Sequence, residues 1–225
     1  MLVSTAFFRD NALILLSNYS GKQMKKFAII FLVLALSGSG AFSQGAPKPI
    51  VGTKGGFNFA NIGGESDNKM KTAFHSGVYS EVFFDYFLMM QAELLLSYQG
   101  HAPFDSQPFS SSLNLVYINL PIMARYNLGY NFNVHAGFQF GVLLSAKSKY
   151  TDSNGDKQSF NVKDQLKGVD VGIPIGVGYE FWDRKLNATV RYIIPINNIS
   201  TDSAFKRTNS VFQLSLGIML MRVDE

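Results

Sequence analysis

Residues 132–144 read FNVHAGFQFGVLL, and their pattern indicates the class of fold. Every second side chain from Phe132 to Leu144 is apolar, while Asn133, His135, Gly137, Gln139 and Gly141 occupy the positions between them. A period of two residues is typical of a β-strand whose two faces meet different surroundings. The stretch therefore predicts a strand with one wholly apolar face.

The same alternation recurs along most of the chain. Residues 169–181 place Val, Ile, Tyr and Phe opposite Asp, Gly, Pro and Glu, and residues 210–223 place Phe, Leu and Ile opposite Gln, Ser and Gly. Such runs predict eight strands and no long helix. The predicted strands lie near residues 50–61, 72–84, 87–99, 113–127, 132–147, 169–181, 186–195 and 210–223.

The face opposite the apolar one carries Gly, Asn, Gln and Ser with single charges, which suits a crowded interior better than a water-facing surface. A polar interior inside an apolar wall is the pattern of a transmembrane β-barrel, because lipid surrounds the wall. The predicted fold is an all-β, eight-stranded antiparallel up-and-down barrel with a side-chain-filled lumen. Its inward charges form the candidate lumen network: Lys54, Glu81, Glu93, Arg125, Asp170, Glu180 and Arg191.

These charges have two interpretations. They form either a buried ion-pair network that holds the barrel closed or a gated, ligand-binding polar core. We favour the ion-pair network, since lone charges in a narrow lumen are costly. Eight strands leave an interior only wide enough for side chains, so an open pore is disfavoured.

The connections between the predicted strands alternate in length. Short ones fall at 85–86, 127–131 and 182–185, and long ones near 62–71, 100–112, 148–168 and 196–209. Outer-membrane barrels alternate short periplasmic turns with long external loops, and an even strand number leaves both termini in the periplasm. The aromatic residues at the short turns predict an interfacial girdle: Phe84, Tyr86, Phe87, Tyr126, Tyr130, Phe132, Tyr179, Phe181 and Trp182.

Residues 24–43 have the three parts of a secretory signal peptide. Met24-Lys25-Lys26 is followed by the apolar run 27–36 and by small residues. Residues 1–23 read as an upstream extension or a misassigned start, and residues 44–225 as the barrel domain. The expected location is therefore the outer membrane of a Gram-negative bacterium.

Composition excludes several classes of protein. The mean hydropathy is +0.08, yet no run approaches the roughly 20 apolar residues of a membrane-spanning helix. Without residues 1–43, 16 basic and 15 acidic residues remain, so no basic excess suggests nucleic-acid binding. The absence of Cys excludes disulfides and thiolate metal sites.

No residues predict catalysis, a metal or a cofactor. His75 and His135 face inward by parity, and His101 lies in a predicted external loop. Asp152–Asp156 resembles the start of a calcium loop but lacks the distal Glu. Its Asn-Gly pair favours a hairpin turn, so Lys149–Phe160 is expected to extend the strands beyond the membrane, with a short helical turn in 161–167.

Two external loops carry exposed aromatic and basic residues that suit contact with a partner protein or lipopolysaccharide. Packing of these loops across the barrel mouth is the alternative. The residues are Pro103, Phe104, Pro108, Phe109, Phe205, Lys206 and Arg207.

The chain resembles the PorT-like family of outer-membrane β-barrel proteins. The resemblance covers nearly all of the mature chain and rests on GTKGGFN at 52–58, YINLP at 117–121, GVGYEF at 176–181 and Arg191-Tyr192. It implies an outer-membrane barrel and, through the family's namesake, export of proteins across the outer membrane by the type IX system.

We therefore expect a non-catalytic structural or interaction component, with outer-membrane lipid and other envelope or secretion proteins as its partners. A small-molecule or lipid-binding barrel is the alternative. A lipid-modifying enzyme is a third possibility, and it requires a Ser or a carboxylate beside one of the three His residues.

Overall fold

The computed structural model describes residues 49–64, 69–85, 87–102, 110–151, 157–202 and 206–222. No helix in these ranges is long and apolar enough to cross a membrane. The elements in chain order are β1 (Ile50–Gly63), β2 (Lys69–Phe83), β3 (Leu88–Ala102), β4 (Ser110–Gly129), β5 (Phe132–Thr151), β6 (Lys157–Asn161), the 3-10 turn η1 (Lys163–Gln165), β7 (Val169–Phe181), β8 (Leu186–Pro195) and β9 (Thr208–Arg222).

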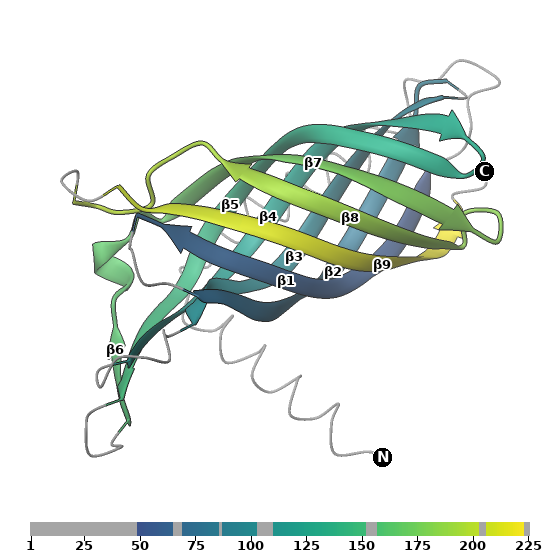
Figure 1. The fold of residues 1–225 in the computed structure, drawn as a ribbon. Helices are drawn as coiled ribbons and strands as arrows, with labels where there is room; N and C mark the ends of the chain where they lie inside the picture. Colours follow the sequence, from purple (N-terminus) through teal and green to yellow (C-terminus); the bar gives the residue numbers. More distant parts are fainter. Residues whose placement is uncertain are drawn as a thin grey trace, which may run out of the picture. The chain divides into compact units, whose positions relative to one another are not determined.

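Eight of these strands close into an antiparallel barrel. The strands pair in the order β4-β3-β2-β1-β9-β8-β7-β5, and a further pairing of β4 with β5 completes the ring. β6 pairs only with the far end of β5, and Figure 1 shows it projecting beyond the tilted strands. The predicted eight-stranded barrel is confirmed.

The predicted strand ranges 169–181 and 186–195 coincide with β7 and β8, and the others differ from the observed strands by no more than four residues at either end. The largest differences arise because β2, β3, β4 and β5 continue their pairing past the predicted limits, as far as Lys69↔Ala102 and Ser110↔Thr151. β6 and η1 confirm the strand extension and the helical turn that were predicted after the fifth strand.

Short connections join the strands at one end of the barrel, which we call the short-turn end. The opposite end is the long-loop end. Ile50 pairs with Arg222, so β1 begins and β9 ends at the short-turn end. Tyr130 and Asn131 both have positive φ, of 49° and 67°, which a two-residue hairpin between β4 and β5 requires.

Aromatic side chains gather at the short-turn end, as predicted. Tyr130 and Trp182 are 95% and 75% exposed. The ring of Tyr179 lies 4.8 Å from that of Phe132 and 4.6 Å from that of Phe181, centroid to centroid. Such a belt suits a membrane–water interface, where one side of each ring is in lipid and the other is wet.

The outer wall of the barrel is apolar. Phe138, Val177 and Leu216 are 56%, 51% and 58% exposed, although each lies in the middle of its strand. A wall with these side chains would be unfavourable in water, since apolar surface of this extent is normally buried. The wall is therefore built for an apolar medium.

Some predictions fall outside the described residues. They are the signal peptide at 24–43, the extension at 1–23, the calcium-like segment 152–156, Tyr86, and the loop residues Pro103, Phe104, Pro108, Phe109 and Phe205.

Candidate functional site

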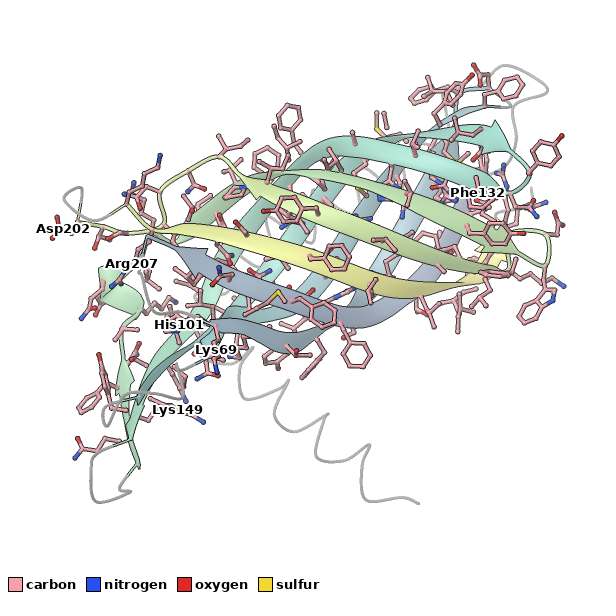
Figure 2. The ribbon with its side chains drawn as sticks, in the orientation of Figure 1. Lys69, His101, Phe132, Lys149, Asp202 and Arg207 are labelled. Carbon is pink, nitrogen blue, oxygen red and sulfur yellow. The ribbon has the colours of Figure 1, made fainter. Side chains whose placement is uncertain are left out.

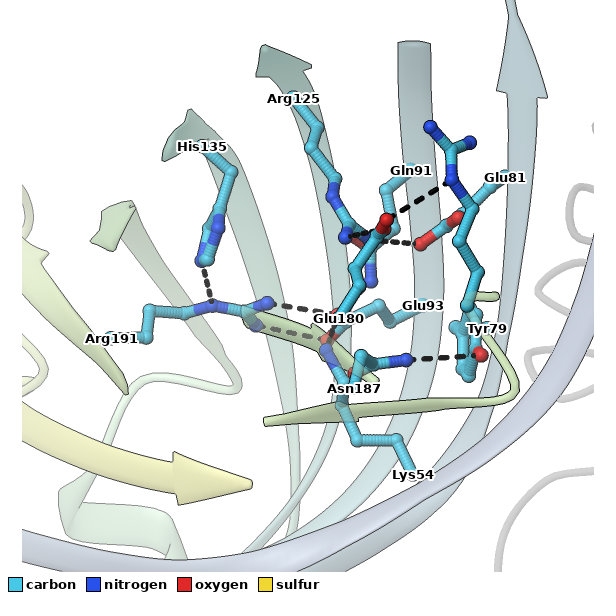
Figure 3. Close-up of polar contacts among 11 residues, drawn as sticks. Lys54, Tyr79, Glu81, Gln91, Glu93, Arg125, His135, Glu180, Asn187 and Arg191 are labelled. Carbon is cyan, nitrogen blue, oxygen red and sulfur yellow. Dashed lines mark hydrogen bonds and ion pairs between the residues drawn. The ribbon is translucent and has the colours of Figure 1, made fainter. Parts of the chain in front are cut away.

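The interior charges form two networks, of which the first is centred on Glu93. Its fully enclosed carboxylate accepts hydrogen bonds from Lys54 Nζ at 2.7 Å and from both terminal nitrogens of Arg191 at 2.8 and 2.9 Å. Gln91 Nε2 adds a bond of 2.8 Å (Figure 3). Glu93 thus links β1, β3 and β8 across the lumen. Its contact with Arg191 is bidentate, and bidentate arginine–carboxylate pairs are strong.

The second network lies nearer the short-turn end. Arg125 donates to Glu81 and to Glu180, and all three side chains are almost fully buried. Glu180 Oε2 also accepts from Arg184 Nε at 3.0 Å. Arg184 belongs to the β7–β8 turn and packs over the ring of Phe83 at 4.9 Å. Strand parity could not have predicted its inward direction, because a turn residue has no defined face.

Asp170 is kept apart from both networks. Its carboxylate accepts a hydrogen bond of 2.7 Å from Asn209 Nδ2, which also donates to Gln99 Oε1 at 2.5 Å. In the described ranges it has no ion pair. The separation follows from height in the barrel, since Asp170 lies at the start of β7, near the long-loop end, whereas Glu180 lies near the end of the same strand. The six remaining predicted charges balance as three cations and three carboxylates.

His75 occupies the middle of the lumen within a chain of amides and hydroxyls. Its Nδ1 lies 2.8 Å from Asn58 Oδ1 and its Nε2 lies 2.8 Å from Ser215 Oγ. Since a side-chain amide oxygen only accepts, Nδ1 carries the proton and Nε2 accepts from the Ser215 hydroxyl. Asn58 Nδ2 also donates to Ser97 Oγ at 2.9 Å. Sequence reasoning missed this serine–histidine–asparagine arrangement because its members lie on different strands.

The other two histidines differ in how well they were predicted. His135 faces inward, as expected, and its Nε2 accepts from Arg191 Nε at 3.3 Å. The prediction that His101 lies in an external loop is wrong. His101 belongs to β3, pairs with Met70 and Leu113, and is only 5% exposed, because the β3–β4 hairpin continues beyond the predicted range.

Apolar side chains fill the lumen at both ends, which the alternation had not indicated. At the short-turn end they come from Ile50, Tyr79, Phe83 and Met89. At the long-loop end two loop residues, Leu166 and Ile199, are buried at 5% and 0% exposure against strand residues. The strand residues there are Ile62, Leu113, Leu115, Tyr117, Leu143 and Ala146. We call these two groups the short-turn plug and the long-loop plug.

Backbone hydrogen bonds fix the two loops that supply the long-loop plug. Lys167 N donates to Ile199 O at 2.7 Å, Thr201 N donates to Gln165 O at 3.1 Å, and Leu166 and Ser200 form an isolated bridge. The plug is thus part of the hydrogen-bonded fold.

Interior glycines make room for the polar side chains. A Cβ on Gly176 would meet the ring of His135, and one on Gly178 would meet the amide of Asn133. In each case a large side chain of β5 lies beside a paired position of β7 that has no side chain. The Gly-rich inner face is therefore the complement of its large polar residues.

No group of three or more His, Cys, Asp or Glu residues within the described ranges could hold a metal ion. Eleven buried side-chain nitrogen and oxygen atoms, Thr189 Oγ1 and His135 Nδ1 among them, have no hydrogen-bond partner among the described residues. Ordered water is the usual partner of such atoms in a polar interior.

An apolar outer wall, a belt of interfacial aromatics and a closed ring of eight antiparallel strands define a β-barrel protein of the Gram-negative outer membrane. The sequence matches the family model "Outer membrane protein beta-barrel domain" over residues 42–201, and the chain belongs to this family. By the general rule for such barrels, the short-turn end faces the periplasm and the long-loop end faces the cell exterior.

Solved structures with a similar fold include Ail, the attachment invasion locus protein of Yersinia pestis, at 9% identity and TM-score 0.48, over 77% of this chain and 99% of that one. Neisserial surface protein A has 11% identity and TM-score 0.41, over 78% and 99%. The N-terminal barrel of Pseudomonas aeruginosa OprF has 11% identity and TM-score 0.36, over 78% and 99%. No curated protein matches the chain. The family assignment rests on the family model.

Proposed function

We propose that this protein is a closed, non-catalytic component of the outer membrane that acts through its surfaces, as a structural or interaction partner in protein secretion. The observation that carries the proposal is the filled lumen. Two ion-pair networks cross it and an apolar plug occupies each end. A solute would have to displace paired charges and plug residues together, which opposes both conduction and ligand binding inside the barrel.

The secretion role comes from the PorT-like resemblance. Tyr117 and Glu180, which belong to the motifs behind that resemblance, are buried in the lumen, and Arg191 is bound to Glu93. These residues therefore support a shared barrel interior, and the role in export is an extension from the family.

The test compares secreted and periplasmic proteins between a clean deletion strain and its complemented parent. We expect cargo to accumulate in the periplasm on deletion. An unchanged distribution would remove the secretion role. Purified protein in planar bilayers should separately show no conductance steps, and stable steps would contradict the closed lumen.

A second candidate function, acyl-ester hydrolysis, is favoured by one observation. Ser215, His75 and Asn58 have the hydrogen-bond order of a nucleophile, a general base and an orienting amide. Burial opposes it, since these side chains are 6%, 2% and 0% exposed and Asn58 Oδ1 also accepts from Gln213 at 2.9 Å. This burial opposes the approach of an ester carbonyl to Ser215 Oγ.

A fluorophosphonate probe distinguishes the two functions. We expect the wild-type protein and Ser215→Ala to be equally unlabelled in outer-membrane vesicles. Labelling that is lost in Ser215→Ala and in His75→Gln would establish the hydrolase and displace the non-catalytic proposal.

A further inference from the structure

A groove of about 480 Å³ crosses the lipid-facing wall over β1, β9, β8 and β7. Its floor is made by Gly55 and Ala188, which both pair with Leu216 of β9. The same row of paired residues continues through Tyr179 of β7 to Phe132 of β5. The groove is therefore a depression where the outward positions on either side of Leu216 carry very small side chains, and its lining is almost entirely apolar.

Gly55 is not required by the backbone. A Cβ at this position would meet its nearest atom, His75 O, at 3.5 Å, which is ordinary van der Waals contact. At the next residue, Gly56, a Cβ would overlap the carbonyl oxygen of Leu214. Gly56 is thus explained by packing against β9 and Gly55 is not. A glycine in a strand weakens it and often marks a site where a ligand approaches closely.

The walls of the groove are large apolar side chains. Phe57 and Leu216 are 59% and 58% exposed and stand beside the small floor residues. A linear hydrocarbon chain fits between such walls, and it gains contacts there that a flat wall does not offer.

The groove begins at the aromatic girdle of the short-turn end, because Phe132 and Tyr179 belong to both (Figure 2 labels Phe132). It therefore lies at the depth of the periplasmic leaflet. Lys185 immediately precedes β8, three residues before Ala188, and is exposed. Lys185 therefore lies on the short-turn side of the groove, where a long basic side chain can reach the level of lipid headgroups.

We propose that this groove binds one acyl chain of a phospholipid of the periplasmic leaflet, with the lipid phosphate paired to Lys185. The apolar lining favours an acyl chain, and Lys185 favours an anionic headgroup. The small side chains of Gly55 and Ala188 leave space for the acyl chain. The site is on the wall and does not depend on the state of the lumen or on the secretion role.

The test is native mass spectrometry of the protein released from membranes and delipidated stepwise in detergent. The paired substitution Gly55→Leu with Ala188→Leu fills the groove without a backbone clash at Gly55. The matched control, Ala124→Leu, adds the same leucine to an outward, exposed position of β4 on another part of the wall. Heat-modifiable migration checks that every variant is folded.

We expect wild-type protein and Ala124→Leu to retain one phospholipid, and the double variant to retain it at least about tenfold less, a difference of about 1.4 kcal/mol. Lys185→Gln should lower retention and remove any preference for anionic headgroups. Equal retention in the double variant, or equal loss in Ala124→Leu, would overturn the proposal.

A photo-crosslinker identifies the occupant in the cell. With Phe57→benzoylphenylalanine, irradiation of intact cells should give a phospholipid adduct on the folded protein. An adduct with a second copy of the chain or with another protein would show that the groove is a protein interface and would overturn the lipid assignment.

Discussion

Glu93→Gln tests the closed lumen most directly. The substitution keeps the shape of the side chain and removes the negative charge that pairs with both Lys54 and Arg191. Glu93 is fully enclosed, so solvent cannot replace the lost charge. Two cations, from β1 and β8, are then left in a narrow interior. We expect the free energy of unfolding to fall sharply.

The magnitude follows from the burial. Breaking one buried ion pair by removing a partner costs about 3–5 kcal/mol, and here one carboxylate serves two cations, so the loss should lie at or above the upper end of that range. Glu81→Gln should cost less, about 1.5–3 kcal/mol, because Arg125 keeps its pair with Glu180. The order of the two losses is set by how many cations are left unpaired.

Urea unfolding in lipid vesicles measures these values, with the fluorescence of Trp182, the single tryptophan, as the signal. The triple variant Lys54→Met, Glu93→Leu and Arg191→Met removes the whole network and should recover most of the loss, since apolar replacement of a buried ion cluster is often neutral or stabilising. Losses of about 0–1 kcal/mol in both single variants would mean that the charges are solvated, and the closed lumen would be refuted.

Three further predictions concern the wall, the plug and the girdle. Gly56→Ala should abolish or strongly lower the heat-modifiable folded band on gels, because overpacking lowers the free energy of unfolding by roughly 1–3 kcal/mol or more. Gly55→Ala should leave this band unchanged. Loss of the band in Gly55→Ala but not in Gly56→Ala would contradict the packing argument. Ile199→Asp should open the long-loop plug, so that a cysteine placed at Gln99 in this Cys-free chain reacts with an impermeant maleimide added to cells. Reaction at the same rate without Ile199→Asp would show that the plug does not seal the lumen. Trp182 fluorescence should be quenched more by lipids brominated near the headgroup than by lipids brominated at the chain end. Equal quenching would show that the aromatic girdle does not lie at the membrane–water interface.

Much of the candidate site was predictable because strand parity assigns each residue to a face. Parity placed Lys54, Arg125 and Arg191 inside with their carboxylates, and the structure brings them into contact with Glu81, Glu93 and Glu180. It gave neither the pairing nor the division into two networks. Those depend on barrel tilt and register, which bring together side chains 39–98 positions apart in the chain.

The apolar plugs were missed for a different reason. The odd positions 113, 115 and 117 of β4 carry Leu, Leu and Tyr, and the even positions change from Asn114 to Val116 and Ile118, so alternation does not mark the lumen face of that segment. Leu166 and Ile199 lie in connections, where no period applies. Only the folded loops show that these two side chains enter the lumen.

Local periodicity was enough to predict the class of fold, because a period of two residues with an apolar outer face has one stable solution in lipid, a closed barrel that leaves no backbone group unpaired. The sequence also predicted which charges face inward and which end carries the aromatic belt. The tertiary structure alone decided which charges pair, that His75 meets Ser215 and Asn58, and that Gly55 and Ala188 form one groove. Each of these depends on contacts between strands far apart in the chain, and local periodicity carries no information about such contacts.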